Sequence, residues 1–359
     1  MLQVSTIVLI ILLVLILALP ATVRKIEENL EIFLFAMAII AGLATGKIFD
    51  VDVWIEALRD PVMIHGVPIG IVQVVLIFGL IAYYIRGRIE RFAERIMNMK
   101  HSHIILGLLT LALGLCSSLI SVIVAAVILA EIVRALKVDR KSKVLYSIYS
   151  CFALGIGAVL TPVGEPLSTI LVSKLKEAHY YTGPGFLFEV FAPIVIPLVI
   201  LFSILAALSV HPSKLRKVPQ ETYVVEEEKL RDIFIRAGKI YLFIMALVIL
   251  GASYSILVKL YFSKLSPDEF YFLGIMSAVV DNATLVAALV SPALSLKDII
   301  FFVTSTLISG GFLVPGNIPN IIVASRIKIR FVEWAKYGLM VGVPVLIAVY
   351  ILLVLAHIM

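Results

Sequence analysis

Charged residues are scarce in this chain. Only 15% of its 359 residues are Asp, Glu, Lys or Arg, whereas 62% are hydrophobic, and the mean hydropathy is +1.11. A soluble domain is about one quarter charged and under half apolar. The composition therefore excludes an ordinary soluble protein and predicts an all-α, multi-pass protein of the cell membrane, with the lipid bilayer as its surroundings.

Cysteine is equally rare, and the motifs of several enzyme classes are missing. The two cysteines, Cys116 and Cys151, lie in apolar surroundings and do not suggest a disulfide framework. The chain has no His-Glu-x-x-His motif, no Gly-x-Ser-x-Gly motif and no Gly-x-x-x-x-Gly-Lys phosphate loop. We therefore expect neither an enzyme nor an ATP-driven pump, and no cofactor. The net charge of +6 does not require a nucleic-acid partner, because the placement of Lys and Arg matters more in a membrane protein.

The N-terminal apolar run lacks the basic residue that would precede it in a signal peptide. Residues 2–21 are apolar, and Arg24 and Lys25 follow them. A signal peptide carries its positive charge first. We interpret residues 1–30 as a first transmembrane helix with its N-terminus outside.

Long apolar runs predict the remaining spans, because crossing a bilayer takes about 20 apolar residues. Uninterrupted spans are expected near 3–21, 31–48, 68–85, 186–209, 240–260 and 335–359. Four other apolar stretches contain polar residues or prolines in their middle: 103–136, 144–178, 270–294 and 299–325. A charged cytoplasmic linker is expected over 211–239.

Positive charge predicts the orientation of these stretches. Lys and Arg are concentrated in four connectors, which are 86–102, 137–143, 211–239 and 326–336. Such connectors face the cytoplasm, whereas the acidic loop 49–67 is expected outside. Both ends of 103–136 then lie in the cytoplasm, so we expect a re-entrant helical hairpin there. By the same parity 270–294 is a hairpin that enters from outside, and both chain termini are outside.

The two halves of the chain show weak but ordered similarity. Segment 117–121 aligns with 277–281, and both run on into Ala- and Val-rich helix. Prolines align as well: Pro162 with Pro315 and Pro166 with Pro319, which places Gly164 opposite Asn317. Two prolines so close together interrupt a helix.

Each half therefore contains two spans, a hairpin and a broken helix. The first repeat covers 31–178 and the second covers 186–327. Their hairpins enter from opposite sides, so the repeats are inverted. Inverted repeats with broken helices are typical of secondary transporters, which bind substrate and coupling ions near the bilayer midplane.

Asp281 and Asn282 stand in the middle of the apolar stretch 270–294. A carboxylate at this depth is costly and suggests function. Hard cations such as Na+ prefer carboxylate, amide and carbonyl oxygens. Burial favours the neutral carboxyl group, so a proton and Na+ can compete for it. The alternative is a structural cap at a helix start.

Glu165 lies between Gly164 and Pro166, inside the interruption of 144–178. It is either a second acidic ligand or a carboxylate that stabilises the broken helix. Other polar side chains at the four interruptions add candidate oxygen ligands, although each hydroxyl can instead bond its own helix backbone. These residues are Thr161, Ser277, Thr284, Ser117, Ser118, Ser121, Asn317 and Asn320. Glu131 is three residues before Arg134, which favours a surface ion pair.

Two motifs resemble those of a known transporter family. Residues 277–288, Ser-Ala-Val-Val-Asp-Asn-Ala-Thr-Leu-Val-Ala-Ala, resemble the second-half motif of NhaD-type sodium/proton antiporters. Residues 160–169, Leu-Thr-Pro-Val-Gly-Glu-Pro-Leu-Ser-Thr, look like their first-half Thr-Pro-x-Gly-Asp/Asn motif. The whole chain resembles an uncharacterised family of short predicted cation transporters in the same ion transporter superfamily.

Two features depart from that family pattern. Glu165 stands where Asp or Asn is expected, and the first tip, 117–121, lacks the Asn and Thr that members often carry. The coupling ion and its stoichiometry therefore stay open. The resemblance implies a homodimer with a scaffold part and a moving transport part.

We expect a secondary active cation transporter, most directly a Na+/H+ antiporter, in which Asp281, Asn282 and Glu165 bind Na+ and protons in turn. An anion or carboxylate carrier of the same superfamily is the alternative, because relatives bind carboxylates through Ser, Asn and Thr. Two acids at the site and the lack of a midplane Lys or Arg argue against it. A third possibility is a receptor or assembly protein that carries no flux.

Overall fold

The computed structural model describes residues 2–27, 29–63, 71–175, 185–210, 230–261, 265–279, 282–290 and 294–358. Within these ranges the protein is helical and contains no strand. Five helical segments are long and apolar enough to cross a membrane, which indicates a membrane-embedded protein, as the composition predicts. They are Ser102–Ile120, Arg140–Leu160, Phe186–Ser209, Leu230–Tyr254 and Phe331–Ala356.

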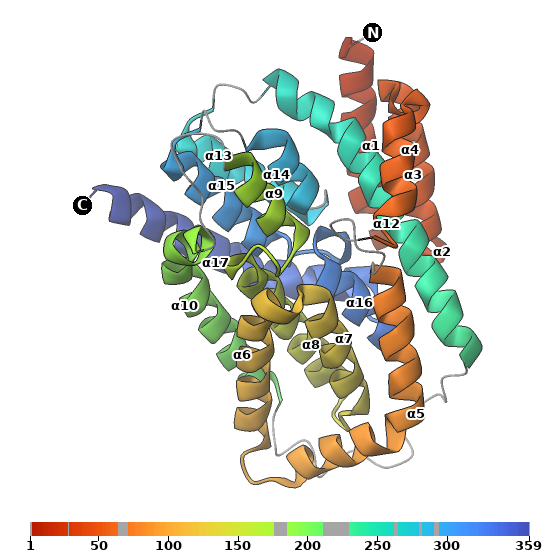
Figure 1. Ribbon diagram of the computed structural model, residues 1–359, viewed down its shortest axis with the longest axis vertical. Helices are drawn as coiled ribbons and strands as arrows, with labels where there is room; N and C mark the ends of the chain where they lie inside the picture. The colour runs from red at the N-terminus through yellow and green to blue at the C-terminus, as the bar shows by residue number, and fades with distance from the viewer. Residues whose placement is uncertain are drawn as a thin grey trace.

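Six helices form a group along one side of the molecule, which we call the side group (Figure 1). They are α1 (Leu2–Thr22), α2 (Arg24–Glu27), α3 (Leu30–Thr45), α4 (Val51–Arg59), α5 (Ile71–Asn98) and α12 (Leu230–Tyr261). The long α12 packs along α3, α4 and α5 and holds the group together. Residues 211–229 of the expected linker lie outside the described residues, whereas 230–239 form the start of α12.

The remaining helices form the main bundle (Figure 1). They are α6 (Ser102–Ile120), α7 (Val122–Ala135), α8 (Arg140–Gly157), α9 (Pro166–Leu175), α10 (Phe186–Ser209), α13 (Pro267–Leu273), α14 (Asn282–Leu289), α15 (Leu296–Ser309), α16 (Ile318–Ile327) and α17 (Phe331–Ile358). α8 lies at its centre and contacts α6, α7, α10, α16 and α17. Nearly every residue of α8 is buried.

Two helices of the main bundle are interrupted where the prolines predict it. α8 continues as a short 3-10 turn to Leu160, and the helix resumes only at Pro166. α15 ends at Ser309, and α16 starts at Ile318 with Pro319 in its first turn. Proline lacks an N–H group and fits the first turn of a helix, where that group has no helical partner. Pro166 and Pro319 therefore occupy the first turns of the helices that follow the two interruptions.

The two polar-centred stretches also consist of paired helical segments. α6 and α7 meet at Ser121, a non-glycine residue with φ of 74°. α13 continues as a 3-10 turn, Gly274–Ala278, and α14 starts at Asn282. A positive φ is unfavourable for Ser, so the tip at Ser121 is locally strained.

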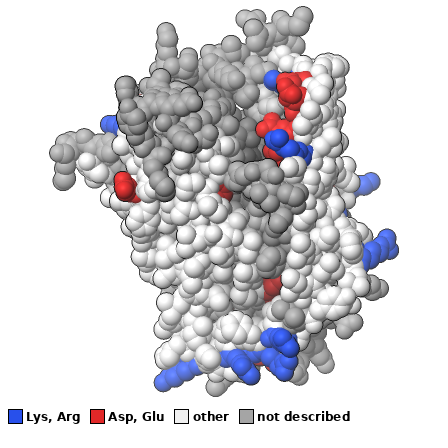
Figure 2. Space-filling model, in the orientation of Figure 1, with Lys and Arg blue, Asp and Glu red and all other residues white. Residues whose placement is uncertain are grey.

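Three of the basic connectors lie together at one end of the molecule. Lys137 forms an ion pair with Glu94, and Arg140 pairs with Glu333 at 2.7 Å. Arg140 also donates to the carbonyl oxygens of Ile327 and Lys328. Figure 2 shows Lys and Arg gathered at the corresponding lower end, which we call the basic end. α6 starts and α7 ends toward this end (Figure 1).

This arrangement predicts the labelling of single cysteines. We expect cysteines at the exposed positions Lys100, Lys141 and Lys328 to react with an impermeant maleimide only in inside-out vesicles, because basic connectors face the cytoplasm. A cysteine at the exposed Asp52 should react only in right-side-out vesicles. Cys116 and Cys151 are replaced by Ser in all variants. Labelling of the three basic positions from opposite sides would contradict the shared end.

Candidate functional site

Asn282 is the most unusual polar side chain at the interruptions. It starts α14 and is only 3% exposed. Neither its Nδ2 nor its Oδ1 has a hydrogen-bond partner among the described residues. The amide packs against Gly310 just beyond the end of α15, since a Cβ there would lie 2.9 Å from both atoms. A buried amide without partners costs about 1–3 kcal/mol, so its retention calls for an explanation such as a ligand.

Carbonyl oxygens from two segments converge beside this amide. A Cβ at Gly316 would lie 2.5 Å from the carbonyl oxygen of Gly310, 2.9 Å from that of Ser277 and 3.1 Å from that of Ala278. Only glycine allows so close an approach of backbone. The break of α15 and the turn before α14 therefore present several oxygens to one small region.

Asn320 holds the interrupted backbone in this position. Its side chain is fully buried, and Nδ2 donates to the carbonyl oxygens of Gly310 and Leu313 at 2.8 Å each. Its Oδ1 has no partner within the described part of the chain. Asn320 thus supports the break and leaves an acceptor oxygen buried beside it.

Ser277 fastens the turn before α14 to α15. Its buried hydroxyl donates to the carbonyl oxygen of Thr306 at 2.7 Å. From the other side, the Ser309 hydroxyl donates to the carbonyl oxygen of Gly274 at 2.8 Å. These two bonds hold the segments whose carbonyl oxygens converge on Gly316.

The first interruption is built in the same way. Ser117 donates to the carbonyl oxygens of Gly114 and Leu154, and Ser118 to that of Leu115. Thr161 reaches across the break to the carbonyl oxygen of Ser118. Ser117 and Ser118 therefore bond the backbone of their own helix, whereas Ser117 and Thr161 also bond the backbone of a neighbouring segment.

Glu165 is buried within this first interruption, at 4% exposure, and immediately precedes α9. A helix N-terminus carries about half a positive elementary charge, which favours a carboxylate there. Nearby, the amide N–H of Val122 at the start of α7 donates to the carbonyl oxygen of Gly164 at 2.9 Å. The break and the tip at Ser121 therefore lie against one another.

Both interruptions repeat the same contacts, with residues of α6 and their equivalents 160 positions apart (274 − 114) and residues of the broken helices 152 positions apart (309 − 157). The contact of Gly114 with Gly157 corresponds to that of Gly274 with Ser309. The contact of Ser117 with Leu154 corresponds to that of Ser277 with Thr306. The contact of Gly164 with Ala158 corresponds to that of Gly316 with Gly310. Gly164 thus matches Gly316, and Glu165 matches Asn317. The sequence alignment is one residue out of register here, because Pro166 is the first residue of its helix and Pro319 is the second.

The remaining candidate residues have distinct positions. Asn317 caps α16 through its Oδ1, which accepts from Ile318 N at 2.8 Å, and its amide packs against Gly155 of α8. Ser121 caps α7 by accepting from Ile123 N. Asp281 and the side chain of Thr284 lie outside the described residues. Backbone carbonyl oxygens near the broken helices were expected at the site, but those at Gly310 and Ser277 were not named; Gly316 beside Pro315 in an apolar stretch was their signal.

Glu131 pairs with Arg134 as expected, but the expected position at the surface was wrong. Its side chain is buried, at 6% exposure, and not at the surface. Both carboxylate oxygens bond Arg326, at 2.6 Å to Nε and 3.0 Å to Nη2, and Arg134 Nε lies 3.3 Å away. A partner 195 positions along the chain replaces the local pairing as the main contact.

A family model matches residues 6–356 of the chain. The protein belongs to the family described as protein of unknown function DUF1646. A search of curated proteins finds no match to the chain. Among the described residues of this DUF1646 member, no group of three or more His, Cys, Asp and Glu side chains could hold a metal ion. The candidate ligands described above are therefore amide and carbonyl oxygens with single carboxylates.

Close packing at the glycines predicts a specific stability effect. A Cβ at Gly164 would overlap the carbonyl oxygen of Ala158, whereas nothing lies within 4 Å of one at Gly238 in α12. We expect Gly164→Ala to lower stability by about 1–3 kcal/mol through overpacking, and Gly238→Ala to be neutral or slightly stabilising. Thermal unfolding in detergent measures both. Equal melting temperatures for the two variants would contradict the packing described.

Proposed function

We propose that this DUF1646 protein is a secondary active cation transporter, most directly a Na+/H+ antiporter. The observation that carries the proposal is the buried Asn282 amide, which lacks a partner among the described residues and lies beside converging carbonyl oxygens. Oxygen atoms of amides and freed carbonyls are the ligands that Na+ prefers where a helix is broken. A site of this kind suits a small, dehydrated cation.

The repeated contacts support a transporter architecture with two related halves. Each half would combine a helical hairpin, α6 with α7 or α13 with α14, and a broken helix. Broken backbone at membrane depth is tolerated only where it is buried in protein or lines a wet cavity. The internal hydrogen bonds of Ser117, Ser277 and Asn320 satisfy part of that demand. The transported ion would bind the carbonyl oxygens that these side chains do not satisfy.

The two carboxylates would provide the coupling. Glu165 precedes α9, and in the sequence Asp281 precedes α14. With Glu165 matched to Asn317, and Asp281 to Ser121, each half contributes one acid and one neutral residue. Binding of Na+ or a proton would neutralise the acid, and the loaded site would then face the other side of the membrane. Release of one species would leave a carboxylate ready for the other.

A carboxylate or oxyanion carrier is the second candidate. Four helices have their N-terminus at an interruption: α7, α9, α14 and α16. The N-terminus of a helix favours an anion. Two acidic residues at the same places oppose an anion, as does the concentration of carbonyl oxygens. Transport assays separate the two candidates.

The first experiment is ion flux in proteoliposomes that carry a pH-sensitive dye. With an imposed ΔpH, we expect NaCl or LiCl outside to drive proton movement, and Asp281→Asn to abolish it, because the amide cannot carry the proton. Glu56→Gln on the exposed face of α4 is the matched control and should transport normally. Normal exchange in Asp281→Asn would contradict the assignment. A response to dicarboxylates alone would favour the second candidate.

Asn282→Leu separates binding from packing. Leu has nearly the same shape and removes a buried amide that has no partner among the described residues, so the protein without Na+ should be equally or more stable. A ligand that binds only the folded state raises its melting temperature, and this rise with Na+ should be present in the parent and absent in Asn282→Leu. A parallel series with choline chloride controls for salt. Loss of stability with an unchanged Na+ response would mean that Asn282 is structural.

A further inference from the structure

Four charged residues are buried among those that the structure describes: Glu31, Glu131, Glu165 and Arg326. Glu31 pairs with Lys239 at 2.6 Å inside the side group, and Glu165 belongs to the site above. The Glu131–Arg326 pair has neither explanation. Replacing a buried ion pair by apolar residues is often neutral or stabilising, so stability alone accounts poorly for this pair.

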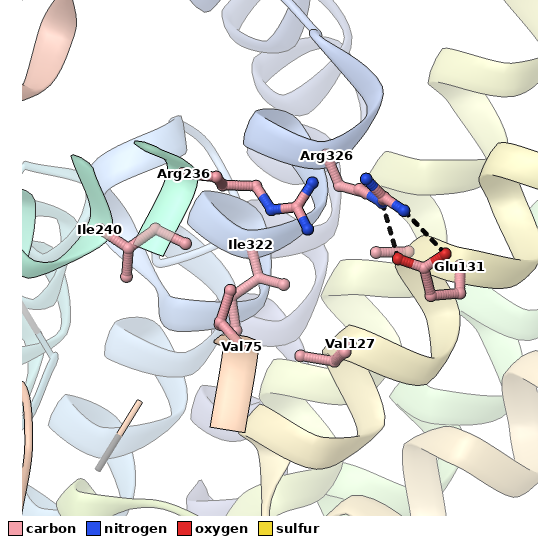
Figure 3. Close-up of a pocket in the computed structure, with 8 residues that line it drawn as sticks. Val75, Val127, Glu131, Arg236, Ile240, Ile322 and Arg326 are labelled. Atoms are coloured by element: carbon pink, nitrogen blue, oxygen red, sulfur yellow. Dashed lines mark hydrogen bonds and ion pairs between the residues drawn. The ribbon is translucent and has the colours of Figure 1, made fainter. Parts of the chain in front are cut away.

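The pair lies in a pocket between the two helix groups (Figure 3). The main bundle contributes Glu131 and Val127 from α7 and Arg326 and Ile322 from α16. The side group contributes Val75 from α5 and Arg236 and Ile240 from α12. Figure 3 shows Arg236 extending from α12 toward α16, and Arg326 directed away from Arg236 toward Glu131. The boundary between the two helix groups, which we call the seam, therefore contains a cluster of three charged side chains, Glu131, Arg236 and Arg326.

The position of the pocket links it to the candidate ion site. α7 and α16 both start at interruptions and run toward the basic end. Glu131 is nine residues beyond the start of α7, roughly 14 Å at about 1.5 Å per residue. Arg326 is in the last turn of α16. A path from the basic end to the site along these two helices would pass the ion pair.

We infer that Glu131 and Arg326, with Arg236 across the seam, form the gate at the basic end of the ion path. This inference rests on the proposed transport function. With the pair formed, α7 is held against α16, and two guanidinium groups repel a cation at the entrance. Opening requires Glu131 to leave Arg326, so that α7 and α16 can separate. Glu131 and Arg326 thus act as positioning residues and not as ion ligands.

Cysteine accessibility tests the gate without requiring transport. The reporter is Val127→Cys in the pocket, in a chain with Cys116 and Cys151 replaced by Ser, labelled in inside-out vesicles. Labelling should be slow in the parent and at least about tenfold faster in Glu131→Gln, because loss of the pair shifts the population toward the open seam. The exposed Lys141→Cys reporter should react equally fast in both. An unchanged rate at Val127→Cys in folded Glu131→Gln would overturn the gate.

Two further variants control for folding and for general charge effects. The reversed pair Glu131→Arg/Arg326→Glu should restore slow labelling, and failure to restore it in a folded protein would refute the pairing. Glu94→Gln breaks the exposed ion pair with Lys137 at the same end and should leave the rate unchanged. If labelling responds as expected but no ion flux is found, the Glu131–Arg326 pair still controls access to the pocket, and the transport proposal fails. If flux is normal and labelling does not respond, only the gate fails.

Discussion

Backbone groups freed inside an apolar protein must find partners, and this demand organises the main bundle. α8 and α15 end among buried residues, as does the 3-10 turn that follows α13. Their exposed N–H and C=O groups cannot be left unsatisfied in a membrane. The structure answers with hydroxyl and amide side chains, such as Ser117, Ser277 and Asn320, that bond carbonyl oxygens of the neighbouring segment. The carbonyl oxygens that converge around Gly310 and Gly316 are the candidate ligands of the site.

Close packing is the second condition for the site. Glycines let segments approach until only backbone separates them: Gly164 meets Ala158, and Gly316 meets Gly310 and Ser277. The same contacts recur in both halves, so the site has two similar frames. The acids break this similarity, because Glu165 lies in the interruption before α9, whereas Asp281 precedes α14 in the sequence. In the proposed exchange of cations, two similar frames would each hold one acid at a different position.

Ion pairs away from the candidate site join segments that are far apart in the sequence. Ion pairs between Lys137 and Glu94 and between Arg140 and Glu333 gather three connectors at one end. Such exposed pairs contribute little stability, but they fix which helix ends are neighbours. The buried Glu131–Arg326 pair differs, because it joins two helices that lead from this end to the interruptions. The pair lies where the main bundle meets α5 and α12 of the side group, so it lines the boundary between the two helix groups.

The sequence by itself determined the membrane class, the helical architecture and the positions of the interruptions. These follow from local properties: apolar run length, proline and glycine, and the placement of Lys and Arg. It also identified Asn282, Glu165 and Asn320 as polar residues in an apolar interior. Only the tertiary structure decided the register between the halves, the oxygens that converge at Gly316 and the partner of Glu131. Those depend on contacts between residues far apart in the chain, such as Glu131 and Arg326, and no local pattern specifies them.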